Sequence, residues 1–236
     1  MIVLLRRKKI LQITLCGVLA LALHFLGVYL ASDELDQADL TKLAGHTVII
    51  DPGHGGIDSG ASGNGIVEKE INLILAQEMA QVLANYGAVV TLTRAEDVDY
   101  YTKGRGGKRH DLKVRMNMMD QSGAELFISI HLNATPFKEA EGAQVFYGGT
   151  LPESKELAEN LQKALKIFPP GNRRESKQDL DILVLNGTHI PGVLIECGYV
   201  TNQAEAHKLK MQEYQQKLVW QIAKGLAYHF TRKEAR

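Results

Sequence analysis

Two histidines and two glutamates fall at the predicted ends of strands or at the start of a predicted helix. His54 follows a short apolar run that ends in Asp-Pro-Gly, His131 ends the run FISIH, and Glu196 ends the run VLIE. Glu68 lies where a helical pattern begins, after a glycine-rich segment. Because ligands of open α/β sheets bind outside the carboxyl ends of the strands, we expect these four groups to converge.

This set of side chains is typical of metal-dependent hydrolysis. Two imidazoles and one carboxylate are the usual protein ligands of a catalytic zinc ion, and a further position stays open for water. The ion lowers the pKa of that water to about 7, and a remaining carboxylate can take its proton and pass it to a leaving amine. We therefore expect one Zn²⁺ per chain.

Each of the four residues also has an ordinary explanation when it is taken alone. The glycines around His54 suit a tight turn, Glu68 suits the first turn of a helix, and His131 suits a hydrogen-bonded core histidine. Glu196 is the most informative, because an acid at the end of so apolar a strand is costly unless it is paired, metal-bound or facing a cleft. The conjunction of the four carries the prediction.

The elements that must position these groups follow from the hydrophobic periodicity. Strands are predicted at residues 47–51, 88–93, 125–131, 144–147, 182–185 and 193–197, and helices at 68–86, 112–122, 154–167 and 213–230. Polar or glycine-rich segments at 53–65, 97–111 and 169–177 predict loops. Strands that alternate with helices indicate an α/β fold, a three-layer sandwich whose mostly parallel central sheet is flanked by helices.

The N-terminal region predicts a membrane anchor ahead of this domain. Residues 6–9 are all basic. The run 10–32 that follows contains no Asp, Glu, Lys or Arg, and His24, Cys16 and Tyr29 are its titratable side chains. Acidic residues begin at Asp33. About 20 apolar residues span a bilayer, and the charge asymmetry keeps the N-terminus inside. We expect a cytoplasmic segment at 1–9, a transmembrane helix at 10–32, a polar tether at 33–45 and a catalytic domain at 46–232. A cleaved signal peptide is the alternative, but Tyr29 occupies a position where cleavage needs a small residue.

Composition argues against several other classes of protein. The chain of 236 residues carries 27 basic and 27 acidic side chains, and four of the basic ones are residues 6–9. The remainder is therefore net acidic, which argues against nucleic-acid binding. The two cysteines, Cys16 and Cys197, are too distant in sequence and context to predict a disulfide framework.

Five motifs together resemble the Amidase_3 family of zinc-dependent N-acetylmuramoyl-L-alanine amidases. They are IDPGHGG at 50–56, EKEIN at 68–72, Thr93-Arg94, SIHLNA at 129–134 and VLIECGYVTN at 193–202. The resemblance implies cleavage of the amide between muramic acid and the first L-alanine of the peptide stem. It also implies that His54, Glu68 and His131 are the zinc ligands and that Glu196 is the catalytic acid and base. Glu70 stands where the family usually has aspartate, which leaves a second acid near Glu68.

A subgroup of this family, the germination-specific amidases of endospore formers, is similar in its single anchor and in the segment 102–115. That similarity implies spore-cortex peptidoglycan as the substrate, with hydrolysis as the first step toward the muramic δ-lactam. It implies a catalytic domain on the extracytoplasmic side of the cell membrane, in the intermembrane space of the developing spore. Some members of this subgroup need a lipoprotein activator that promotes zinc binding.

Four further residues near the motifs are candidates for substrate binding or for support of the site. Arg94 and Arg115 suit the carboxylates of a stem peptide, with structural ion pairs as the alternative. Asn133 can orient His131 or bind substrate, and Asp51 can orient a histidine or close the turn. Two rival functions also stay open, a zinc peptidase that trims stem peptides and a non-catalytic wall-binding module. The role of loop 102–111 is likewise open.

Overall fold

The computed structural model describes residues 14, 16–23, 27, 34–101 and 107–234. The chain divides into two compact units, Met1–Gln37 and Ala38–Arg236, and the second holds every element discussed below. No helix within the described ranges is long and apolar enough to cross a membrane. The predicted segment 1–9 and most of the predicted span 10–32 lie outside the described residues, so both stay predictions.

A six-stranded sheet forms the centre of the second unit, in the order β4-β1-β5-β8-β6-β7. The strands are β1 (Thr47–Pro52), β4 (Val89–Leu92), β5 (Leu126–Asn133), β6 (Gln144–Tyr147), β7 (Lys177–Gln178) and β8 (Gly192–Tyr199). Strand β6 runs antiparallel to β8, and the other pairs in this sheet are parallel. The prediction of an α/β fold with a mostly parallel sheet is confirmed.

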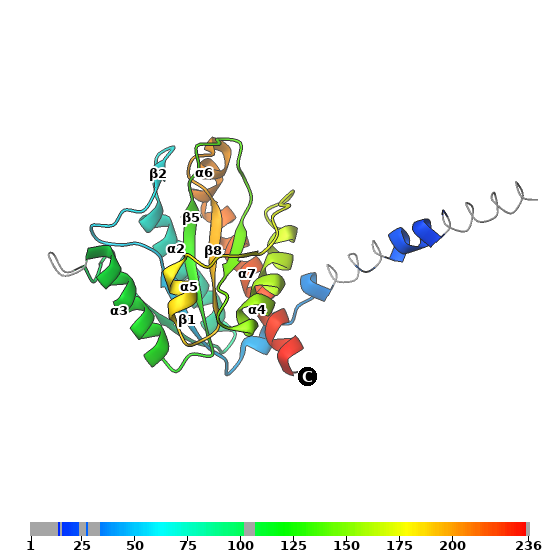
Figure 1. Cartoon of the computed structure of the whole chain (residues 1–236), viewed down its shortest axis with the longest axis horizontal. Helices are drawn as coiled ribbons and strands as arrows, with labels where there is room; N and C mark the ends of the chain where they lie inside the picture. The colour runs from blue at the N-terminus through cyan, green and yellow to red at the C-terminus, as the bar shows by residue number, and fades with distance from the viewer. Residues whose placement is uncertain (1–13, 15, 24–26, 28–33, 102–106, 235–236) are drawn as a thin grey trace, which may run out of the picture. The chain divides into compact units, whose positions relative to one another are not determined.

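Helices flank the sheet on both faces (Figure 1). On one face lie α2 (Glu68–Asn85), α4 (Pro152–Ile167) and α7 (Gln212–Glu234), and on the other lie α3 (Gly107–Gln121) and α5 (Leu183–Gly187). Successive strand residues point to opposite faces, so Val48 and Ile50 join the first core while Ile49 joins the second. Burial on both faces explains why the central strands read as continuous apolar runs.

Several short elements complete the unit. They are the 3₁₀-helix η1 (Leu40–Leu43), the antiparallel hairpin of β2 (Ser62–Gly63) and β3 (Ile66–Val67), and α6 (Gln203–Leu209). Asn64 and Gly65 make the hairpin turn with positive φ, as a tight two-residue turn requires. Asn202 caps α6 by accepting the N–H groups of Ala204 and Glu205. Such elements are too short to show a periodicity, and the sequence did not predict them.

The structure corrects two predicted elements. The predicted strand at 182–185 is part of the helix α5, and a short apolar run cannot by itself distinguish these two forms. In this position Val184 and Leu185 pack in the second core with Met119 of α3. Helix α3 begins at Gly107 within the predicted loop 97–111, where an ion pair between Lys108 and Asp58 ties down its first turn. Residues 102–106 of the predicted loop lie outside the described residues.

Candidate metal centre and active site

Two buried arginines hold the glycine-rich loop that follows β1. Arg94 donates to the backbone oxygens of Pro52 at 2.9 Å and Gly53 at 3.1 Å. Arg115 donates to those of Pro52 at 2.8 Å and His54 at 2.6 Å. Because both side chains are buried and committed to these carbonyls, their geometry favours support of the loop over direct contact with substrate.

Asp51 supplies the negative charge beneath this loop. Its buried carboxylate accepts hydrogen bonds from Thr93 at 2.6 Å, Ser129 at 2.7 Å and Arg115 at 3.0 Å, and none of these partners is a histidine. Burial by itself would raise the pKa of Asp51, but the charge of Arg115 and the two hydroxyl groups hold it below its ordinary value. Asp51 therefore fixes the end of β1 relative to α3, β4 and β5.

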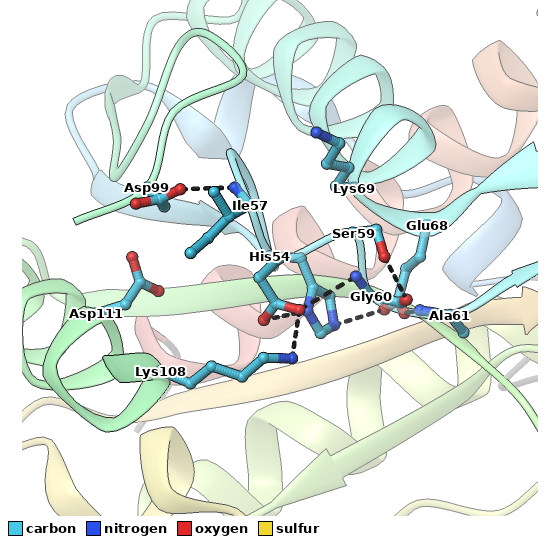
Figure 2. Close-up of polar contacts among 12 residues, drawn as sticks. His54, Ile57, Ser59, Gly60, Ala61, Glu68, Lys69, Asp99, Lys108 and Asp111 are labelled. Atoms are coloured by element: carbon cyan, nitrogen blue, oxygen red, sulfur yellow. Dashed lines mark hydrogen bonds and ion pairs between the residues drawn. The ribbon is translucent and has the colours of Figure 1, made fainter. Parts of the chain in front are cut away.

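His54, Glu68 and His131 converge as the sequence predicts, and they can hold a metal ion. One ligand atom from each lies within 4.8 Å of the others. Glu68 Oε1 is 3.2 Å from His54 Nε2 and 3.0 Å from His131 Nδ1. Ligands of a tetrahedral zinc ion, bound at about 2.0–2.1 Å, lie about 3.3 Å apart, so the donor set and its spacing fit such an ion. Figure 2 shows the His54 ring next to the carboxylate of Glu68.

Backbone groups position the Glu68 carboxylate at the start of α2. Its two oxygens accept the N–H groups of Ala61 at 2.7 Å and Leu132 at 3.1 Å. Burial would raise the pKa of Glu68, but hydrogen bonds and charge from His131 and His54 lower it well below its ordinary value. Glu68 is therefore ionised at neutral pH, as a metal ligand must be. Glu70, the second acid of this motif, is exposed on α2.

Two glycines of the loop are required by close approach to these ligands. A Cβ atom on Gly53 would lie 2.2 Å from Nε2 of His131, and one on Gly60 would lie 2.5 Å from Oε2 of Glu68. His54 itself has a positive φ of 61°, a backbone conformation that is uncommon for residues other than glycine. The glycine-rich composition of the motif thus follows from how tightly the loop wraps its ligands.

Asp58 and Lys108 are supporting residues that the sequence reasoning missed. Oδ2 of Asp58 lies 3.0 Å from Nδ1 of His54, and Lys108 donates to the other carboxylate oxygen at 2.6 Å. A carboxylate on the second nitrogen fixes the tautomer and orientation of a ligand histidine. The available signal was an acid shortly after His54 in the same loop. Figure 2 shows the side chain of Lys108, from α3, extending toward His54.

Glu196 lies beside the ligands on the neighbouring strand, in register with His131. Its Oε2 is buried and has no hydrogen-bond partner among the described residues. Burial raises the pKa of Glu196 to about 7; the nearby His131 opposes this shift and the Glu68 charge adds to it. A carboxyl group with such a pKa can exchange a proton near neutral pH.

The site opens into a cavity of about 290 Å³ between α3 and α5. His54 and His131 form part of its lining, and apolar side chains of Ile182, Val184 and Leu194 face them. Asn133, the last residue of β5, contributes a backbone oxygen that accepts the N–H of Val200. The structure thus brings the four principal candidates together beside this cavity. Of the predicted site residues, His54, His131, Asp51 and Arg115 line it, whereas Glu68, Glu196 and Arg94 are not among the described residues of its lining.

Two imidazoles and an ionised carboxylate around one point, with a second acid of raised pKa beside a cleft, define a metal-dependent hydrolase. Residues 48–228 match the model of a family described as N-acetylmuramoyl-L-alanine amidase, Amidase_3. The chain belongs to this family. Its activity is hydrolysis of the amide between N-acetylmuramic acid and L-alanine in peptidoglycan.

Similar proteins agree with this assignment. The germination-specific N-acetylmuramoyl-L-alanine amidase of Bacillus subtilis is 38% identical over 195 residues, which cover 81% of this chain and 82% of that protein. The probable cell wall amidase LytH of Staphylococcus aureus is 33% identical over 82% of this chain and 63% of its own length. Among solved structures, the CwlD amidase from Clostridioides difficile in complex with the GerS lipoprotein has 36% identity and a TM-score of 0.75. That match covers 79% of this chain and 99% of the solved one.

We predict that Asp51→Asn lowers the free energy of unfolding by about 2 kcal/mol at pH 7, because it removes one of the two carboxylates, Asp51 and Asp111, that pair with the buried guanidinium of Arg115. The folded-state pKa of Asp51 is depressed, so its contribution is present above its ordinary value of 3.8 and is lost as the pH falls through the lowered value. Chemical denaturation at several pH values measures the free energy of unfolding of both proteins. The difference between variant and wild type should become smaller in acid. Glu159→Gln, at an exposed position, is the control. A difference in free energy of unfolding that is the same at pH 7 and in strong acid would contradict the prediction.

We predict that Glu196→Gln, unlike Asp51→Asn, raises the free energy of unfolding of the metal-free protein. The folded-state pKa of Glu196 is raised from 4.5 to about 7, so ionisation destabilises the fold progressively as the pH rises between these values. Removing the charge should stabilise the metal-free fold by about 1–3 kcal/mol at pH 8 and by almost nothing at pH 4. Thermal unfolding in the presence of a chelator measures the difference, and an unchanged melting temperature at pH 8 would refute it.

Proposed function

We propose that the chain is a zinc amidase in which His54, Glu68 and His131 bind one Zn²⁺ and Glu196 transfers the proton. The donor set supports zinc, since two imidazole nitrogens and one carboxylate oxygen suit its borderline character and its tetrahedral geometry. His54, Glu68 and His131 would hold the ion, and a three-ligand zinc site would keep one position for water. His54 and His131 also line the cavity, from which water and substrate would reach the ion. The observation that carries the proposal is the convergence of the three donors, with Glu196 in register beside His131, next to a cavity that His54 and His131 line.

Bound zinc supplies a Lewis acid that polarises the scissile carbonyl and acidifies water. The remaining tasks belong to side chains of this chain. Glu196 accepts a proton from the attacking water and returns it to the departing alanine amine, for which a pKa of about 7 is suitable. Asp58 keeps Nε2 of His54 directed at the ion by holding Nδ1.

The proposed substrate is the peptidoglycan of the spore cortex, where removal of the stem peptide precedes δ-lactam formation. The support is the 38% identity with a germination-specific amidase over most of both chains. A lipoprotein partner is part of the proposal, because the similar CwlD amidase was solved in complex with the GerS lipoprotein.

We further propose that residues 10–32 anchor the chain in the cell membrane, with the catalytic domain outside. Its support is the sequence alone: basic residues 6–9, a long run without charge, and the acids that follow it. In a sporulating cell this orientation places the enzyme in the intermembrane space of the developing spore. There it faces the peptidoglycan that it is proposed to cut.

We predict that the zinc-loaded protein, with the partner lipoprotein added, releases intact stem peptides from isolated sacculi. Mass spectrometry should find peptides with a free L-alanine amine, whereas a peptidase would leave shortened stems on the glycan. Glu196→Ala should keep the fold and the metal and lose about 10²–10⁴-fold in turnover. Glu70→Ala removes an exposed acid from the same motif and should stay active, and full activity of Glu196→Ala would overturn the assignment.

We predict that substitutions of His54 and of its partner Asp58 lower zinc affinity to different degrees. His54→Ala removes a ligand and should abolish zinc binding, and Asp58→Asn should weaken it by about 10–100-fold because it only disturbs the orientation of the ring. Elemental analysis and competition with a chromophoric chelator measure both. The exposed His189→Ala is the matched control, and unchanged zinc content in His54→Ala would refute the ligand assignment.

A further inference from the structure

A second and larger hollow lies at the end of the sheet near the β2–β3 hairpin and α6. It is a groove of about 1200 Å³. Figure 1 shows α6 and β2 at the same end of the sheet. Its walls are the hairpin turn at 63–64, the segment after β5 at 135–138, and the segment from the end of β8 through α6 at 201–210. None of the four principal active-site residues lines it.

The three walls of the groove nevertheless continue the elements that carry the active site. The hairpin leads directly into Glu68, the segment at Thr135 follows His131, and the segment at Thr201 follows Glu196. Extended chain advances about 3.3 Å per residue, so the groove begins on the order of 10–15 Å from the ligands. A peptide whose first residue lies at the reaction centre would reach it with its fourth and fifth residues.

Specific hydrogen bonds hold the walls together. The side-chain amide of Asn64 donates to the backbone oxygen of Val200 at 2.8 Å, and Lys210 donates to the backbone oxygen of Asn64 at 3.0 Å. On the other side, the N–H of Thr135 donates to the hydroxyl of Thr201 at 3.3 Å. A groove that is already formed loses little conformational entropy when it binds an extended ligand.

The charged and titratable side chains of the groove are all basic or neutral. Lys138, His207 and Lys210 line it, and none of the described residues of its lining is an aspartate or a glutamate. The cavity at the metal centre differs, because Asp51, Asp58 and Asp111 are among its residues. Positive potential thus gathers on one side of the reaction centre, on a domain whose sequence beyond residue 9 is net acidic.

We propose that this groove binds the distal part of the stem peptide and that Lys138 and His207 contact its C-terminal carboxylate. This proposal rests on the proposed amidase function and names the part of the substrate that determines affinity. A stem peptide extends from the scissile amide on the alanine side and ends in a free α-carboxylate. Its length matches the separation of the groove from the ligands, and its charge complements the lining. The sugar side of the substrate then occupies the cavity between α3 and α5.

The test compares two soluble disaccharide tetrapeptides, one with a free C-terminal carboxylate and one with a C-terminal carboxamide. The enzyme is the zinc-loaded full chain with its lipoprotein partner. Lys138→Ala, alone and with His207→Ala, should raise KM for the carboxylate substrate by about 3–10-fold with little change in kcat, as expected for loss of exposed ion pairs. For the carboxamide, variant and wild type should be equal. Lys138→Arg should restore wild-type KM, and Lys155→Ala on α4 controls for net charge.

A binding measurement makes the test independent of turnover. NMR titration of the Glu196→Ala protein with the released tetrapeptide should show chemical-shift changes at the groove residues. Adding Lys138→Ala should raise the dissociation constant from this titration by the same factor as it raises KM. Two results would overturn the groove assignment and leave the amidase function standing. One is a wild-type KM that is the same for both substrates, and the other is an increase in KM by Lys138→Ala that is the same for both. Failure of the wild type to release peptide from either substrate would instead overturn the proposed function.

Discussion

Burial of two guanidinium groups beneath the loop that follows β1 is the constraint on which the active site depends. Arg94 and Arg115 donate to backbone oxygens of consecutive residues, so the loop cannot relax toward a regular turn without breaking charged hydrogen bonds. Asp51 compensates part of this charge and is itself bonded to two other strands through Thr93 and Ser129. The strained backbone of His54 is maintained because its surroundings permit no alternative.

The two functional glutamates occupy environments that push their proton affinities apart. Glu68 receives two backbone N–H groups and faces two imidazoles, all of which favour the ionised form. Glu196 is partly buried beside a negative neighbour, and its buried Oε2 has no hydrogen-bond partner among the residues that the structure describes. Both conditions favour the neutral form. Two residues of identical chemistry can thus serve as ligand and as proton carrier, because their surroundings differ. The expected stabilisation by Glu196→Gln is a measure of what this specialisation costs the fold.

The sequence predicted the position of a functional side chain wherever that side chain adjoins a strand or helix with a recognisable hydrophobic pattern. His131 and Glu196 could be placed because each ends an apolar run with the length and composition of a buried strand, and Glu68 because a clear helical period begins there. The strand expected at 182–185 was wrong because four apolar residues carry no period, and packing against Met119 decided their form. Asp58 and Lys108 were missed because their roles arise from contact between a loop and the first turn of α3, which no local pattern encodes.

The positions of the ligands along the chain determine when an ion can be captured. Two come from the segment around β1 and α2, but His131 comes from a strand that pairs only when distant parts of the chain meet. The sheet and its two cores are built from apolar contacts that need no ion, in contrast to small zinc domains that are unfolded without metal. An ion held by these three residues would therefore bind after the sheet has formed. In that case the activity of an already folded chain would depend on the supply of the ion, and control of that supply would control when the enzyme acts.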